Sequence, residues 1–249
     1  MTAESTLAPG RLRPVGAIAQ ERRRDRWFFT GMAVAAALTV FVGFAPTYYL
    51  RSVVGGPPLR TLVHLHGFLN TTWMLLFIVQ TSLIAARRTG VHRRLGVAGG
   101  VLAALLLVVG WFTAIEAARR GVTPPGGPPP LAFLSVPLGA LAVFAILVAT
   151  GIYNRARSET HKRLMLLATI ALLTPAIARF RYYGFGGPAV AIGGTCAFVV
   201  VCLLYDRLSH GRVHPAFLWG GLFVMLSLPA RFAAGGTDAW HAVAVWLTR

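Results

Sequence analysis

Seven apolar stretches run through this chain of 249 residues, and each is long enough, or nearly long enough, to cross a lipid bilayer. A spanning helix needs about 20 mostly apolar residues, and in lipid its backbone amides must bond within the segment. The sequence therefore predicts an all-α, polytopic membrane bundle of about seven helices. The predicted spans are 27–50, 62–85, 95–117, 131–153, 164–178, 188–205 and 215–230.

Two of the predicted spans and the segment after the last span need separate treatment. The fifth and seventh stretches are short and flanked by arginine, so they must recruit polar flanks or enter only part of the bilayer. After the last span, Trp240, Val243, Ala244 and Leu247 fall on one helical face. This spacing predicts a short interfacial helix that lies along the membrane surface.

The basic residues are unevenly distributed in a chain whose formal net charge is +17. With a cytoplasmic amino terminus, 16 Lys and Arg residues lie inside and 8 outside, the usual bias of an inner-membrane protein and not that of a nucleic-acid-binding protein. Arginine outnumbers lysine 23 to 1, which indicates a GC-rich bacterial gene. We expect a bacterial inner-membrane protein with its carboxyl terminus outside. Its expected parts are a basic cytoplasmic tail (1–26), a transmembrane domain (27–231) and an outer-face segment (232–249).

The second span carries a polar stripe. His66, Asn70, Trp73, Phe77 and Gln80 lie within an arc of about 80° when successive residues turn by about 100°. Polar side chains in a membrane helix face the bundle interior or a cavity, so we expect this stripe to point inward. Two interpretations remain open. The stripe is either a ligand-lining path or a set of hydrogen bonds that hold neighbouring helices together.

Two similar motifs begin the third and fifth spans. The sequence reads V-H-R-R-L at 91–95 and T-H-K-R-L at 160–164, which puts His92 and His161 at one membrane level. Two imidazoles with flanking cations are what a b-type haem needs for its axial positions and its propionates. The cations are Arg93, Arg94, Lys162 and Arg163. The alternative is that each motif is an interfacial cap and a topology signal.

The remaining polar residues point to few further sites. Glu116 is the one acid at an outer helix end, and we predict that it pairs with Arg179. His210 and His214 are four residues apart, but no acid or cysteine completes a metal-ligand set, so no metal site is expected. The chain has no hydrolase, metalloprotease or phosphate-loop motif, so no catalytic residue is predicted.

The order of these residues resembles a family of uncharacterised bacterial multi-span inner-membrane proteins. The resemblance rests on H-x-H-G at 64–67, Gln80, H-R-R-L-G at 92–96, H-K-R-L-M at 161–165 and Arg179, and it covers about half of the chain. Leu164 stands where that family has tryptophan. The resemblance implies a multi-span bacterial membrane protein and no particular activity.

A more remote similarity is to the di-haem transmembrane cytochromes b. That similarity implies His92 and His161 as the pair for an inner haem and His66 as half of an outer pair, although the fourth span contains no histidine.

Three functions follow from these observations. The first is an accessory or assembly subunit of a larger membrane complex, of a respiratory or redox kind. The second is a redox protein that binds one b-type haem, or a quinone, through His92 and His161 near the cytoplasmic face. The third is a carrier of a lipid or a small apolar molecule that uses the polar stripe of the second span. The expected partners are the lipid bilayer and other membrane subunits.

Overall fold

A computed structural model describes residues 15–249, except for the side chains of residues 15–19, 21 and 22. The first 14 residues of the predicted basic tail therefore lie outside the described part. Every regular element within 15–249 is a helix. The long helices are α1 (Val15–Phe44), α3 (Thr61–Ala85), α4 (Thr89–Arg119), α6 (Ser135–Tyr153), α7 (Ser158–Ala171), α9 (Pro188–His210) and α10 (Pro215–Gly235).

Short helices complete the elements. They are η1 (Ala45–Tyr49), α2 (Arg51–Val54), α5 (Pro130–Phe133), α8 (Thr174–Ala178), η2 (Arg179–Tyr183) and α11 (Asp238–Leu247). Seven segments are long and apolar enough to cross a membrane, which confirms the predicted polytopic helical bundle. They are Arg23–Tyr49, Thr61–Ala85, Thr89–Arg119, Pro130–Tyr153, Ser158–Tyr183, Pro188–His210 and Pro215–Gly235.

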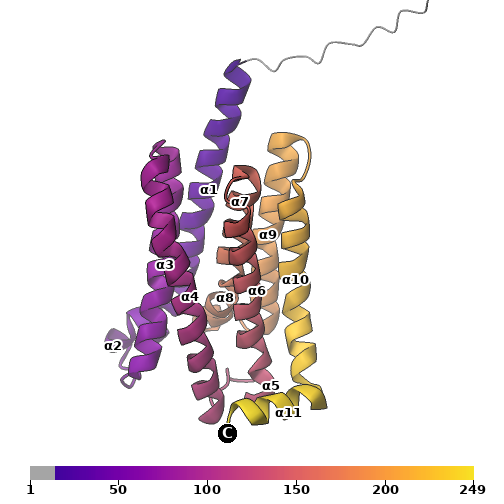
Figure 1. Ribbon diagram of the computed structural model, residues 1–249. Coiled ribbons are helices and arrows are strands. Elements are labelled where there is room, and N and C mark those ends of the chain that lie inside the picture. The colour runs from indigo at the N-terminus through magenta and orange to yellow at the C-terminus, as the bar shows by residue number, and fades with distance from the viewer. Residues whose placement is uncertain (1–14) are drawn as a thin grey trace, which may run out of the picture.

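The long helices run up and down, so the bundle has two distinct ends (Figure 1). The amino end holds the start of the first span and the turns at 86–88, 154–157 and 211–214. The carboxyl end holds α2, α5, η2 and α11. Helix α11 lies across the carboxyl end rather than along the bundle, as expected for the interfacial helix (Figure 1). Its Ala244 is fully buried against Leu134, and Trp240 Nε1 donates a hydrogen bond to the Leu131 carbonyl at 2.9 Å.

The fifth span, whose apolar part is short, is divided into three shorter helices. Helix α7 ends at Ala171, α8 begins at Thr174, and η2 completes the crossing. Pro175 explains why the first helix does not continue, because it has no backbone N–H to donate to the preceding turn. The span is also the most buried of the seven, and α7 contacts α1, α6, α9 and α10. The fifth span is therefore the centre of the bundle, and with its polar ends it is long enough to cross a bilayer.

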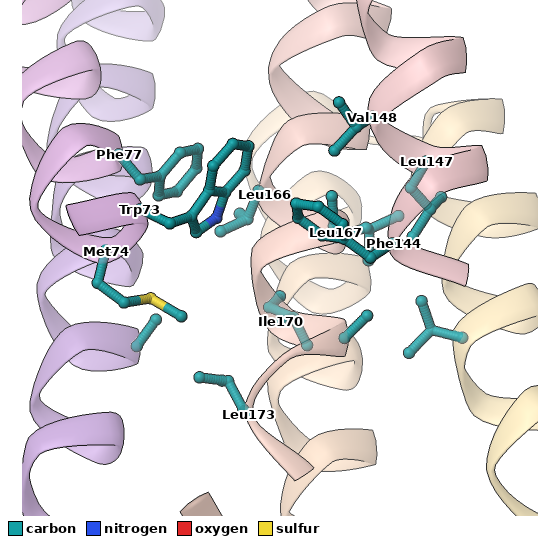
Figure 2. Packing of buried hydrophobic residues seen from close by; sticks show 14 of the residues in the cluster. Trp73, Met74, Phe77, Phe144, Leu147, Val148, Leu166, Leu167, Ile170 and Leu173 are labelled. Carbon is teal, nitrogen blue, oxygen red and sulfur yellow. The ribbon is translucent and has the colours of Figure 1, made fainter. Parts of the chain in front are cut away.

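The core between α3, α6 and α7 is closely filled. Figure 2 shows Trp73 and Phe77 of α3 directed toward Leu166 and Ile170 of α7, with Phe144 of α6 close by. Trp73 and Phe144 meet edge to face, with ring centroids 5.0 Å apart. These contacts hold α3 and α6 against α7.

Candidate functional site

The two predicted histidines come together at the amino end of the bundle. His92 is the fourth residue of α4 and His161 the fourth residue of α7, so equivalent turns place them at one level. Their ring centroids are 6.3 Å apart, and the ring planes make an angle of 81°. The resemblance between the two motifs in the sequence therefore corresponds to a contact in space.

Each of these rings is oriented by a hydrogen bond at Nδ1. His161 Nδ1 lies 2.8 Å from the Gly151 carbonyl oxygen of α6. In the amide orientation that satisfies both neighbours, Gln80 donates to His92 Nδ1 at 2.7 Å and accepts from the Gly96 amide at 3.1 Å. Gln80, the last member of the polar stripe, therefore belongs to the histidine pair rather than to a path through the second span.

Two of the four flanking cations are not available to a ligand of the histidines. Lys162 Nζ is bonded to Asp25 at 2.5 Å and to Glu159 at 2.6 Å, and Arg163 is bonded to acids as well. In contrast, Arg93 and Arg94 of α4 are exposed. Lys162 and Arg163 thus neutralise carboxylates, and the role of the four cations beside a haem stays a prediction.

Arg163 is the centre of a charged cluster that the sequence analysis missed. Its side chain is 2% exposed and that of Asp206, on α9, is fully buried. The guanidinium grips the Asp206 carboxylate on two sides, with Nε donating to Oδ2 at 2.9 Å and Nη2 to Oδ1 at 2.6 Å. Its Nη1 donates to Glu159 Oε2 at 2.6 Å. Two ionisable residues in apolar helices were the available signal for this pair, but neither sequence position indicates the partner.

The cluster continues to α1 and α10. Tyr205 donates to Asp25 Oδ1 at 2.6 Å, and His210 lies 3.3 Å from Asp25 and 3.5 Å from Asp206. The backbone amide of His214 donates to Asp206 Oδ2 at 2.9 Å. The cluster therefore ties Asp25 of α1 and the first turns of α7 to the end of α9 and to the turn between α9 and α10.

His214 acts as a helix cap. Its Nδ1 accepts a hydrogen bond from the Ala216 amide at 3.1 Å, which satisfies one free N–H of the first turn of α10. Burial lowers the pKa of His214 below its ordinary value, and the nearby Arg163 charge acts in the same direction. Both influences favour the neutral ring, which is the form whose Nδ1 can accept the capping hydrogen bond.

The other residues of the polar stripe face the bundle, where they contact neighbouring protein groups. Trp73 is 3% exposed and its Nε1 donates to Thr169 Oγ1 at 3.2 Å, while Phe68 on the opposite face is 64% exposed. Asn70 donates to the His66 carbonyl at 2.8 Å and lies 3.3 Å from His66 Nε2. The hydrogen bond of Asn70 lies within α3, and that of Trp73 joins α3 to α7. Because the buried Trp73 lies between the polar residues, the stripe does not form a continuous polar path.

The predicted Glu116–Arg179 pair is not formed. Glu116 accepts from Arg60 at 2.6 Å, because α3 begins beside the end of α4. Arg179 donates to the Pro175 carbonyl at 2.8 Å, and its guanidinium lies 4.2 Å from the centre of the Phe44 ring. Arg179 thus packs against the first span rather than against the third.

No family model, curated protein or solved structure matches this chain.

Proposed function

We propose that this protein binds a b-type haem through His92 and His161 and carries single electrons as an accessory subunit of a larger membrane redox complex. The observation that supports this proposal is the 6.3 Å separation of the two ring centroids. Two metal–nitrogen bonds of about 2 Å, plus the distance from each nitrogen to its ring centre, add up to about 6 Å. The separation of the two rings thus fits one metal ion between them.

The hydrogen bond at Nδ1 of His161 also fits ligation through Nε2. Histidines that bind a metal usually donate their other ring N–H to a carbonyl or a carboxylate, which fixes the ring and its tautomer. The Gly151 carbonyl has this relation to His161. His92 differs, because the Gln80 amide that accepts from Gly96 donates to Nδ1, so ligation through Nε2 requires this amide to turn over and give up the Gly96 hydrogen bond.

The cations fit the group in part. Arg93 and Arg94 are exposed next to His92 and suit the haem propionates, whereas Lys162 and Arg163 are already neutralised by acids. When bound, such a haem would supply one-electron transfer, and His92 and His161 would hold it. The role of the chain is to hold the two imidazoles, to orient them, and to accept the propionate charges.

An absorption spectrum of the purified protein tests the haem. We expect a reduced-minus-oxidised band of a b-type cytochrome at close to one haem per chain. His92→Ala and His161→Ala are each expected to lose it, whereas His241→Ala, which changes an exposed histidine of α11, keeps it. A colourless protein from haem-replete cells, or a metal ion bound without porphyrin, contradicts the haem proposal.

The accessory role has a separate test. The chain carries no recognised catalytic motif, so an electron carrier of this kind needs partners that supply and accept electrons. We expect purification from its own membranes in mild detergent to retain other redox subunits in a fixed ratio. A protein that always runs alone, with its haem intact, contradicts the accessory role and leaves the haem proposal standing.

A further inference from the structure

Arg231 is a buried arginine whose guanidinium lacks a full set of partners. It lies on α10, four residues before the last residue of that helix, and is 6% exposed. Its Nη2 donates to Ser227 Oγ at 2.7 Å, whereas its Nε is buried and has no hydrogen-bond partner within residues 15–249. On the Nε–Nη2 edge of this guanidinium, therefore, only Nη2 donates a hydrogen bond.

The surroundings of Arg231 hold the side chain inside the bundle. A Cβ atom on Gly139 of α6 would lie 2.7 Å from the Arg231 Cγ, so the glycine makes room for the arginine stem. Ser135 Oγ donates to the Arg231 backbone carbonyl at 2.7 Å, which holds α6 and α10 together at this level. The buried position of the guanidinium is thus built by both helices.

A cation at this depth needs a negative partner. An unpaired charge in a membrane helix is costly, and such residues pair with an anion or face water. The described acids either pair with other cations or lie on the surface. Glu116 is bonded to Arg60, and Asp238 is exposed at the start of α11. Asp25, Glu159 and Asp206 belong to the cluster at the amino end.

Arg163 shows how this chain satisfies a buried guanidinium. Its Nε and Nη2 together grip the two oxygens of Asp206. Arg231 presents the same Nε–Nη2 edge with only the Ser227 hydroxyl on it. The planar fork of arginine matches phosphate oxygens as well as carboxylate oxygens.

We propose that Arg231 binds a phosphate-type oxyanion between α6 and α10 at the carboxyl end of the bundle. Its position, about 6 Å from the end of α10 at 1.5 Å per residue, is near the level of lipid headgroups. The oxyanion is either the phosphodiester of a lipid headgroup or free phosphate. The proposal is independent of the histidine pair at the other end of the bundle.

Thermal unfolding of the full chain in a non-ionic detergent distinguishes these sources. Phosphatidylglycerol is compared with a diacylglycerol of the same acyl chains, and inorganic phosphate with chloride at equal ionic strength. For a lipid phosphodiester, we expect phosphatidylglycerol to raise the unfolding midpoint by several degrees over the diacylglycerol. For the free ion, we expect inorganic phosphate to do so over chloride.

Arginine variants show whether the effect belongs to this site. Arg231→Gln is expected to lose at least half of the increase, whereas Arg120→Gln, which removes an exposed charge at the same end, keeps it. If Arg231→Gln does not fold, Arg231→Lys keeps the charge without the Nε–H and is expected to show a reduced increase. Equal midpoints in all four conditions for the unmodified protein, or equal increases in the Arg231 variant that folds, would overturn the proposal.

Discussion

The buried pair of Arg163 and Asp206 makes a sharp prediction about stability. Asp206→Asn keeps the shape of the side chain and can still accept the amide hydrogen bond from His214, but it removes the charge that faces the guanidinium. Arg163 is 2% exposed, so water cannot replace the lost carboxylate. The variant therefore leaves a buried cation with only Glu159 as its acidic partner.

The size of the effect follows from this geometry. Removing one partner of a buried ion pair typically destabilises a protein by about 3–5 kcal/mol. Because Glu159 still lies 2.6 Å from Arg163, we expect the lower end of this range, about 3 kcal/mol. For a chain of this length, each kcal/mol shifts the unfolding midpoint by about 2–4 °C, so the expected decrease is about 6–12 °C.

The pair of Arg60 and Glu116 supplies a matched control. These side chains also meet at 2.6 Å, but they are 57% and 37% exposed. Exposed pairs contribute about 0–1 kcal/mol, so Glu116→Gln is expected to change the midpoint by less than about 4 °C. Unfolding in mixed micelles, followed by circular dichroism, measures both variants. If Asp206→Asn unfolds within 1 °C of Glu116→Gln, burial is not what strengthens the Arg163 pair.

Two further predictions concern helix packing and pH. A methyl group in Gly43→Ala would collide with the Ala176 carbonyl, so we expect a loss of about 1–3 kcal/mol, whereas Gly193→Ala, which meets nothing within 4 Å, is neutral or slightly stabilising. Thermal midpoints of the two variants check this, and equal midpoints would refute it. Because the pKa of His214 is lowered in the folded state, its contribution to stability is complete above the ordinary value of 6.5 and is lost as the pH falls through the folded pKa. His214→Ser keeps a cap that does not titrate, so the stability of the original protein should fall relative to this variant between pH 8 and pH 5; a constant difference would contradict the reasoning.

The sequence predicted the spans well because lipid imposes one strong rule, that backbone groups bond within each apolar segment. The fifth span differs in detail, because its apolar part alone is too short to cross. Its crossing uses the polar residues of the α7 start and of η2, and Pro175 divides it. Apolar length alone does not reveal such a division, because the flanks are stabilised by contacts with other helices.

The histidine pair was predictable for a different reason than the ion pairs. His92 and His161 lie within similar motifs at equivalent turns, so the sequence predicts a shared membrane level, and helix packing then brings the two rings together. The partner of a charged residue depends instead on which helices are neighbours. Glu116 meets Arg60 because α4 packs on α3, and the sequence contains no equivalent signal for that neighbour.

The buried arginines Arg163 and Arg231 lie toward opposite ends of the bundle and differ in their acidic partners, and this difference has a physical consequence for the histidine site. At the amino end, Asp25, Glu159 and Asp206 neutralise the two cations that directly follow His161. Those bonds fix the first turn of α7 against α1 and α9, and the ring of His161 is carried on that turn. The charged cluster therefore makes His161 a preorganised partner for His92. At the carboxyl end, Arg231 has no such acid among the described residues, and its positive charge remains for a ligand from outside the chain.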